Sequence, residues 1–516
     1  MIRINPKGSP SAINRRAFLK LSAAAVFSGF SGCSRRGPLV DFPIEINDDL
    51  LRGHLIYEGL DESFANTDPK RFDTLIVGAG ISGLAAAVRL GEDDVVICDI
   101  GESAGGSSGA QTYEGLAFSQ GAHYELEYPH YYGSEALEFL SNLNVIKFNS
   151  WRRVWEFTER RFLIDLDRKN RCLIEGKFRS EVLPDDEDTA KFEKLVQRYA
   201  GLLPMPTRMI PEKLHSLNEI TFEDFLGRHS LLGSPGLIQG VNYRLTDDYG
   251  GGMRDVSALA GLHYYQCRPY DTEVVNVFSP PEGNFHFARK MLDQLSPDQI
   301  LTSHLVKRIH PENREFRVEV IDLNERRRKT FLAKRIVYAG QKHGLKFVLP
   351  EEAGLFSGNR YAPWIVFNFV LDGTVSSEYW QNEMIGHDPH LLGFVNSQAQ
   401  EQSREHTVLT AYYCLAGEHR TALVDLERNP RFWVERTLRS IALSLKSDIT
   451  KQVRKCFIKL HGHAMPIPGP GYLLRDGNLG RKYPNLVYAG VDAGRLPLFF
   501  EAVDSGIMAA NLLSRI

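Results

Sequence analysis

Three glycines, Gly78, Gly80 and Gly83, follow the spacing G-x-G-x-x-G between an apolar segment and an alanine-rich segment. In a strand-turn-helix unit, the first glycine permits a tight turn and the second lets the backbone approach a pyrophosphate. The third lets the helix pack closely on the strand. The helix would begin at Ile81 and Ser82, where free N–H groups and the helix dipole favour phosphate. The pattern therefore predicts a dinucleotide-binding β-α unit.

A carboxylate stands where this unit would need one. The apolar run over residues 95–98 reads as a second strand, and it ends in Asp99, 21 residues after Gly78. A carboxylate about 20 residues beyond the first glycine accepts hydrogen bonds from ribose hydroxyls in such units. NAD and FAD share this half of the pattern, so the remainder of the chain must decide between them.

A second glycine pair, Gly105 and Gly106, follows Asp99 closely. The segment resembles the glycine pair of the flavin amine oxidase and phytoene desaturase superfamily, which contacts the flavin side of FAD. That family usually carries Arg directly after the pair, whereas this chain has Ser107. The resemblance implies FAD as the cofactor, with a weaker phosphate contact at this position.

The end of the chain is similar to the closing unit of the same family, with N-L-V-Y-A-G-V-D-A-G over residues 485–494 and a small-residue helix over 500–510. The resemblance implies that Asp492 binds the ribityl or pyrophosphate group and that the backbone at Ala502 and Val503 caps the flavin. It also places the adenine near the backbone of Val306. These likenesses favour FAD over NAD.

Two histidines are the candidate catalytic groups. His123 follows the glycine pair, and His463 precedes the closing unit, so the resemblance places both near the flavin. A histidine there could take a proton from a substrate, because its ordinary pKa lies near 6.5. The alternative for each is a packed structural role. His461 and His463 have no nearby carboxylate or Cys to complete a metal site, so no metal is predicted.

Many amine oxidases of this superfamily place a lysine near flavin N5. The corresponding strand here is expected over residues 363–369, and it contains no Lys. Lys342 stands earlier and is predicted to be a surface residue. Aromatic clusters such as Ala411–Tyr413 serve more often as core than as a substrate cage. Oxidation of an amine therefore stands beside desaturation of a C–C bond as an open alternative.

The chain alternates between β-α units and aromatic-rich regions, which predicts an α/β fold. Its Rossmann-like FAD-binding domain is expected to be discontinuous, over residues 71–125, 290–345 and 456–516. An α+β substrate domain is inserted over 126–289 and 346–455, in a two-domain architecture like that of p-hydroxybenzoate hydroxylase. Residues 34–70 are expected to form an exposed tether, with ordered structure from about Arg71.

The N-terminal residues predict export. Residues 14–20 read N-R-R-A-F-L-K, followed by a short apolar stretch, which resembles a twin-arginine signal read by the twin-arginine export machinery. The stretch is about half the length of a membrane span. Cys33 ends a sequence that resembles a lipobox, so peripheral membrane attachment through an acyl chain is an open alternative. Localisation in the periplasm, or otherwise outside the cytoplasmic membrane, follows.

The chain has 516 residues and a formal net charge of −3, and residues 1–32 hold five cations and no acid. The remainder is more acidic still, which argues against nucleic acid as a partner. Its six Cys include no C-x-x-C pair. The sequence thus predicts an exported FAD-dependent oxidoreductase, amine oxidase-like, with an amine or lipid-like small-molecule substrate. Alternatives are an isoprenoid or lipid desaturase and a non-catalytic flavin-binding electron-transfer partner.

Overall fold

The structure is a computed structural model that describes residues 40–48, 50–57, 69–127, 132–165, 170–267, 276–375, 379–400, 405–417 and 420–515. Every helix and strand given below belongs to one unit of the chain, Phe42–Ile516. The predicted export signal and Cys33 lie outside the described residues.

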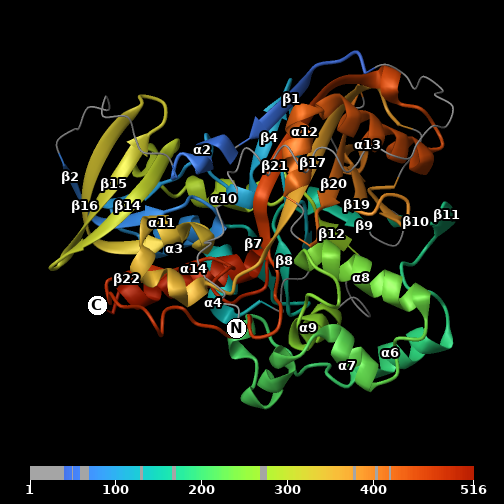
Figure 1. Ribbon diagram of the computed structural model, residues 1–516, viewed down its shortest axis with the longest axis horizontal. Coiled ribbons are helices and arrows are strands. Elements are labelled where there is room, and N and C mark those ends of the chain that lie inside the picture. Colours follow the sequence, from blue (N-terminus) through green and yellow to red (C-terminus); the bar gives the residue numbers. More distant parts are fainter. Residues whose placement is uncertain are drawn as a thin grey trace, which may run out of the picture. The chain divides into compact units, whose positions relative to one another are not determined.

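A seven-stranded sheet carries the glycine-rich turn (Figure 1). Its strands, in spatial order, are β13 (Ile300–Leu301), β3 (Val95–Cys98), β2 (Lys70–Val77), β16 (Arg327–Tyr338), β15 (Glu315–Asp322) and β14 (His304–Glu312), and β22 (Leu486–Tyr488) also pairs with β16. The strands β13, β3, β2, β16 and β22 run parallel, and β15 is antiparallel to both β14 and β16. The last four residues of β2 are buried, as expected for a strand covered on both faces.

Two helices from opposite ends of the chain pack together beside this sheet. Helix α3 (Ile81–Leu90) follows the glycine turn, and helix α14 (Phe499–Leu513) closes the chain. A Cβ added at Gly506 of α14 would lie 2.3 Å from the carbonyl oxygen of Ser82, so glycine is needed for this close approach. The shorter helices α4 (Ser134–Asn142), α10 (Phe285–Leu292) and α11 (Leu345–Val348) complete this region.

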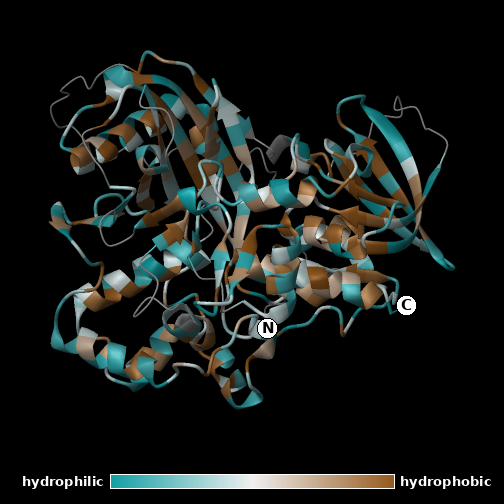
Figure 2. Cartoon of the chain, turned by 180° about the vertical axis from the view of Figure 1, so that it is seen from behind, coloured by the Kyte–Doolittle hydropathy of each residue, from teal (hydrophilic) through white to brown (hydrophobic). Residues whose placement is uncertain are grey.

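An eight-stranded sheet forms the second layer of the molecule. Its strands, in spatial order, are β1 (Ile44–Asp48), β21 (Val453–Pro466), β17 (Tyr361–Asp372), β20 (His406–Cys414), β19 (Leu391–Asn396), β18 (Gln381–Ile385), β10 (Asn170–Ile174) and β11 (Lys177–Arg179). The central strands are buried along almost their whole length, so they lie between layers and not at the surface. In Figure 2 brown segments of the strands lie towards the inside of the molecule, while the outer strands of the seven-stranded sheet carry long teal stretches.

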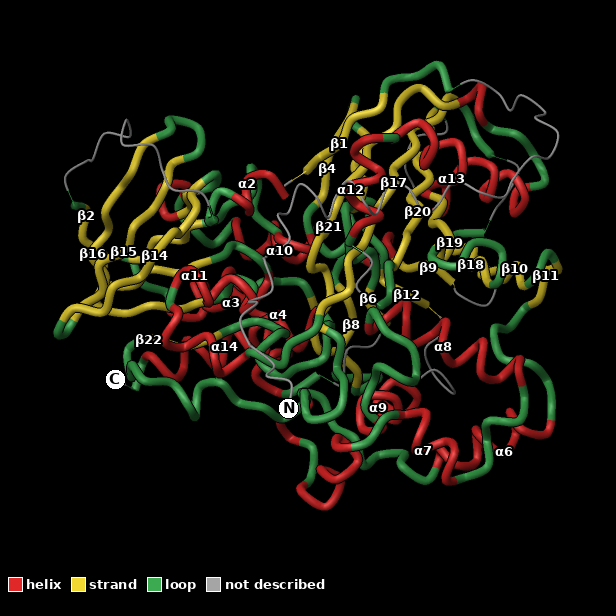
Figure 3. Tube along the Cα trace, in the orientation of Figure 1, coloured by secondary structure: helices red, strands yellow, loops and turns green. Residues whose placement is uncertain are grey.

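Helices border the eight-stranded sheet on more than one side. They are α6 (Glu187–Gln197), α7 (Phe222–Arg228), α8 (Pro235–Tyr249), α9 (Ala258–Cys267), α12 (Thr421–Arg428) and α13 (Pro430–Leu445). Figure 3 shows α6 to α9 gathered together, with α12 and α13 beside β17 and β20. Smaller sheets link the layers: β6 (Glu125–Leu126) with β12 (Asn276–Phe278) and β9 (Leu163–Asp165), β4 (Ala110–Tyr113) with β5 (Leu116–Ser119), and β7 (Ile146–Asn149) with β8 (Val154–Phe157).

The α/β class and the Rossmann-like unit are confirmed, but two segments differ from expectation. Part of the predicted tether is ordered: it contains β1 and helix α2 (Leu50–His54), because β1 pairs in parallel with β21 over five positions. Strand β21, predicted within the cofactor domain, belongs to the eight-stranded sheet. The pairing of β1 with β21 joins residues more than 400 positions apart, and that of β17 with β21 also joins distant segments, which local patterning does not reveal.

Among the described residues, no helix combines the length and the apolar character needed to cross a membrane.

Candidate functional site

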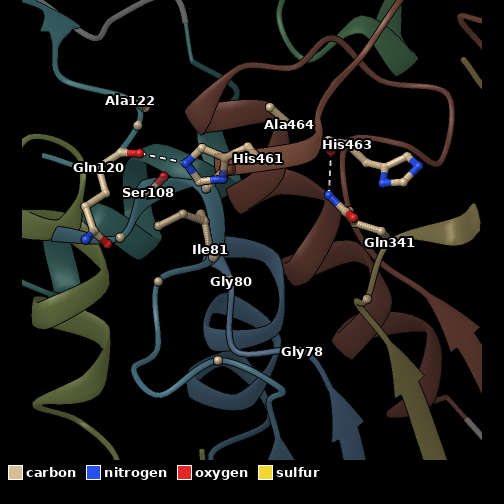
Figure 4. A pocket seen from close by; sticks show the side chains of 18 of the residues that line it. Gly78, Gly80, Ile81, Ser108, Gln120, Ala122, Gln341, His461, His463 and Ala464 are labelled. Atoms are coloured by element: carbon tan, nitrogen blue, oxygen red, sulfur yellow. Dashed lines mark hydrogen bonds between the residues drawn. The ribbon is translucent and has the colours of Figure 1, made fainter. Parts of the chain in front are cut away.

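A cavity of about 1070 Å³ lies between the two sheets. Its walls come from the glycine-rich turn, the loop after β3, the start of β14, the end of β21 and the start of α14. Figure 4 shows the turn at Gly78 and Gly80 with His461 and His463 of β21 above it. Most of the residues predicted to bind a cofactor therefore line one space.

The glycine turn has the geometry that its spacing predicted. Gly78 has a φ of +99°, a left-handed conformation that favours glycine. A Cβ on Gly83 would lie 1.9 Å from the carbonyl oxygen of Gly78, so the helix could not pack this closely on the turn with any other residue. At Gly80 the nearest heavy atom to an added Cβ is 4.0 Å away, which leaves open space in front of the backbone.

The two glycine segments lie against each other. Gly80 and Gly105 form an isolated parallel bridge, and the Gly105 amide donates to the carbonyl oxygen of Ala79 at 2.8 Å. A Cβ on Gly106 would approach the Cα of Gly80 to 3.2 Å. Helix α3 begins here without a side-chain cap and without an acidic residue in its first turn, and Ile81 and Ser82 line the cavity. Uncapped N–H groups at a helix N-terminus favour an anion.

Asp99 holds this arrangement together. Its Oδ2 accepts a hydrogen bond from the amide of Ala79 at 2.5 Å, and its Oδ1 accepts one from the amide of Gly101 at 2.7 Å. A carboxylate oxygen can accept more than one hydrogen bond, so these contacts leave acceptor capacity. Asp99 lines the cavity, and its predicted contact with a ribose stays a prediction.

Of the three remaining predicted cofactor ligands, two lie at the cavity and one does not. Val306 and Ala502 line the cavity. Val503 is fully buried in the hydrophobic core and does not line the cavity. The α14 residues that reach the cavity are instead Phe499, Phe500 and Ala502, preceded by Leu498, because α14 begins at Phe499 and turns its next face towards α3.

Asp492 is the centre of a buried polar cluster. Its Oδ1 accepts from Lys342 Nζ at 2.9 Å, and its Oδ2 accepts from the Lys342 amide at 2.7 Å and the Tyr361 hydroxyl at 2.9 Å. Lys342 Nζ also donates to the carbonyl oxygens of Gly340 and Ala489. The prediction of a surface Lys342 is wrong: the residue is 2% exposed, because these acceptors lie inside the protein.

His123 lies in an aromatic part of the cavity. Its ring stacks on Tyr412 with centroids 4.9 Å apart, and Trp380 and Tyr124 lie within 6 Å. Its Nε2 and the Tyr412 hydroxyl are buried without a hydrogen-bond partner among the described residues. Burial lowers the pKa of His123 to about 3, so the ring is neutral at pH 7. Buried polar atoms without partners are rare in folded proteins, which suggests a ligand contact.

His463 stacks on a second histidine that the sequence did not single out. The rings of His463 and His343 lie 3.7 Å apart at 16°, and the backbone oxygen of His463 accepts from Gln341 Nε2 at 2.5 Å (Figure 4). Burial and the neighbouring His343 lower the pKa of His463 to about 3, and burial lowers that of His343 to about 4. Both are therefore neutral at pH 7, and His463 is a weak proton acceptor. Its neighbour His461 donates a hydrogen bond from Nε2 to the Gln120 carbonyl oxygen at 2.7 Å, which fixes its ring.

Several charged residues of the cavity wall escaped the sequence analysis. Lys459 lies on β21, directly paired with Val366 of the strand where a lysine was sought. Asp247 and Asp248 line the cavity from α8. Burial raises the pKa of Tyr412, and the negative charge of Asp247 raises it further. Their spacing in sequence gives no signal, since α8 and β21 lie more than 200 positions apart in the chain.

The residues present fit a dinucleotide. The backbone in front of Gly80 is open, the α3 N-terminus is uncapped, and Asp99 and Asp492 stand at separate places along the same cavity. Within the described part of the chain, no group of three or more His, Cys, Asp or Glu is arranged to hold a metal ion.

Comparison with known proteins agrees with this geometry. Residues 76–143 match the family model described as an NAD(P)-binding Rossmann-like domain. No curated protein matches the chain in sequence. The class defined by fold and site is thus an α/β protein with a Rossmann-like dinucleotide-binding domain.

Solved structures share this fold over most of the chain. Cyclohexylamine oxidase from Brevibacterium oxydans IH-35A has a TM-score of 0.62 at 14% identity, over 86% of this chain and 99% of that one. Putrescine oxidase bound to putrescine has a TM-score of 0.60 at 14% identity, over 88% and 100%. A protein from Exiguobacterium sp. 255-15 described as a protoporphyrinogen oxidase has a TM-score of 0.60 at 16% identity, over 88% of this chain and 99% of that one.

We predict that Asp492→Ala destabilises the cofactor-free protein by about 3–5 kcal/mol, because it leaves the Lys342 ammonium buried without its carboxylate. Urea unfolding measures the change. The double variant Lys342→Met/Asp492→Ala should recover more than half of the loss. Asp372→Ala removes an exposed carboxylate that pairs with His406, and it should cost less than about 1 kcal/mol. An unchanged unfolding midpoint for Asp492→Ala would contradict the role assigned to this pair.

Proposed function

We propose that this chain is an FAD-dependent oxidoreductase of the amine oxidase type, which removes a hydride from the carbon beside an amino group. The observation that carries the proposal is the continuity of the cavity. One space joins the glycine cradle at Gly80 to an aromatic chamber with Trp364 and Tyr412, and the carboxylates Asp247 and Asp248 lie in its wall.

FAD is proposed over NAD because the cavity has two glycine segments and a second carboxylate. Gly78–Gly83 and Asp99 suit the ADP half of the cofactor. Gly105, Gly106 and Asp492, together with the start of α14 near Ala502, suit the remaining half. When bound, FAD would supply an acceptor for the hydride. The protein would supply orientation and an enclosed site from which water is excluded.

An amine is proposed as substrate because the chamber combines carboxylates with aromatic faces. Asp247 and Tyr412 both line the cavity, and a cation gains from both a carboxylate and an aromatic ring in a partly desolvated site. The unpartnered Nε2 of His123, neutral at pH 7, could accept a hydrogen bond from the amino group. Two of the structural neighbours carry names that refer to amines, cyclohexylamine and putrescine. A wholly apolar substrate of a desaturase would gain nothing from the carboxylates.

Lys459 is proposed as the lysine that acts beside the flavin. It lines the cavity from β21, and a cation there would stabilise negative charge that develops on the reduced cofactor. His463 lies on the same strand, but a pKa of about 3 makes it a poor general base at neutral pH. We assign His463 a structural role in the wall, with His343 stacked against it.

We also propose that the protein is exported through the twin-arginine pathway and is active outside the cytoplasm. Support comes from the sequence of residues 14–20 and from the apolar stretch that follows. That pathway carries folded proteins, which suits a cofactor inserted before export. Acylation of Cys33 would hold the protein at a membrane surface.

The purified protein should release FAD on heating, as measured by chromatography and the visible spectrum. Gly80→Glu should lose FAD, because the new carboxylate fills the open space in front of the turn, while the stability of the cofactor-free protein should barely change. Gly354→Glu is the matched control, since it also faces open space but lies away from the cavity. Normal FAD occupancy in Gly80→Glu would show that the cofactor lies elsewhere.

Primary amines should bleach the flavin under anaerobic conditions, and Asp247→Asn should lower kcat/KM for them at least about tenfold, equivalent to about 1.4 kcal/mol. FAD content should stay the same. Asp255→Asn removes a carboxylate that pairs with Arg360 outside the cavity, and it should have little effect. Bleaching by polyenes and not by amines would assign the chain to the desaturase alternative.

Lys459→Met should slow flavin reduction by a saturating amine about 10²-fold, because a positioned cation is lost from the site. Stopped-flow absorbance, normalised to bound flavin, measures this rate. His463→Asn, on the same strand, should change it less than about threefold. The reverse order of effects would make His463 the reacting base and Lys459 a structural residue.

A further inference from the structure

A short segment upstream of the glycine turn crosses the cavity wall. We call its described residues, 44–48 and 50–57, the N-terminal strap. Strand β1 of the strap pairs with β21 from Ile44 to Asp48. Beyond α2, the carbonyl oxygen of Leu55 accepts from Lys307 Nζ of β14 at 3.0 Å. The Tyr57 ring packs edge-on against Phe347 of α11, with centroids 4.6 Å apart.

These contacts attach the strap to both sheets. Strand β21 belongs to the eight-stranded sheet and β14 to the seven-stranded sheet, so the strap spans the space between them. Residues along most of the strap line the cavity, from Glu45 to Asn47 and from Arg52 to His54, together with Ile56 and Tyr57. The strap is therefore part of the cofactor cavity and not a tether outside it.

Arg52 places a guanidinium beside the loop after β3. Its Nη1 donates to Ser303 Oγ at 3.3 Å, and its Nη2 pairs with the carboxylate of Glu102. Ser303 immediately precedes β14, and Glu102 follows Asp99 by three residues. The Arg52 side chain is 24% exposed, so it lies mostly within the wall.

The glycine loops beside Arg52 contribute no Lys or Arg to the described cavity wall. The glycine segments at 78–82 and 99–111 contain neither residue type. Of the described residues that line the cavity, Arg52 and Lys459 are the only Lys or Arg. Lys459 lies on β21, paired with Val366 in the other sheet. Arg52 is therefore the cation of the strap that could neutralise a pyrophosphate at the glycine turn.

We propose that Arg52 of the N-terminal strap binds the ribose-pyrophosphate part of the dinucleotide, supplying from upstream the cation that the glycine loops lack. The inference rests on the proposed dinucleotide site. A guanidinium presents a planar fork that matches phosphate oxygens bidentately. Its present partner Glu102 is 77% exposed, and an exposed ion pair contributes little, so Arg52 can exchange that contact for a phosphate at small cost.

The test compares three probes on cofactor-free protein: FAD, ADP and FMN, which lacks the adenosine half. Arg52→Ala should raise the Kd for FAD and ADP at least tenfold, as measured by flavin fluorescence and calorimetry, and leave the Kd for FMN unchanged. Arg52→Lys should restore part of the affinity through its charge. Arg454→Ala, whose side chain is 33% exposed and paired with Glu114 away from the cavity, is the matched control.

The outcomes separate this inference from the proposed function. Wild-type affinity for ADP in Arg52→Ala overturns the role of Arg52 and leaves the FAD proposal intact. Equal losses for FMN and ADP also overturn it, because they show a general distortion of the cavity. Wild-type protein that binds ADP through Arg52 but neither FAD nor FMN overturns the proposed function alone. Wild-type protein that binds none of the three probes overturns both.

Discussion

The contact between two backbone segments without side chains governs the rest of the site. The turn at Gly78–Gly83 lies against the loop at Gly105 and Gly106, and a Cβ on Gly106 would approach Gly80 to 3.2 Å. Asp99 ties the two segments through the amides of Ala79 and Gly101. Because the contact removes side chains from this place, it leaves backbone N–H groups and open space for a phosphate. The glycines thus determine both where α3 begins and where a ligand can lie.

The buried pair of Lys342 and Asp492 connects this cradle with the eight-stranded sheet. Tyr361, at the start of β17, donates to the same carboxylate, and the carbonyl oxygens of Gly340 and Ala489 accept from the lysine. A buried ion pair stabilises only when its remaining hydrogen bonds are satisfied, and here several are. The cluster holds Asp492 at the cavity with an orientation that a lone carboxylate would not keep.

Charge is distributed unevenly along the cavity, and this unevenness relates the two proposals. Near the glycine cradle, Arg52 of the strap is the cation beside a wall that otherwise carries carboxylates such as Asp99 and Glu102. In the aromatic chamber, Asp247 and Tyr412 line the wall, and the neutral His123 stacks on the Tyr412 ring. An anionic group is thereby favoured at one end and a cationic group at the other, as a dinucleotide and an amine would require.

The sequence by itself determined the parts of the site that depend on local chain geometry. The spacing of Gly78, Gly80 and Gly83 and the strand ending at Asp99 predicted the turn correctly, because φ preferences and close approach are properties of neighbouring residues. Strand pairing and burial depend instead on residues that are distant in the chain. The pairing of β1 with β21, the burial of Lys342, and the arrival of Arg52, Asp247 and Lys459 at one cavity all join residues far apart in the chain. Only the tertiary structure decided these, since long-range packing sets which charged side chains face each other and which are withdrawn from water.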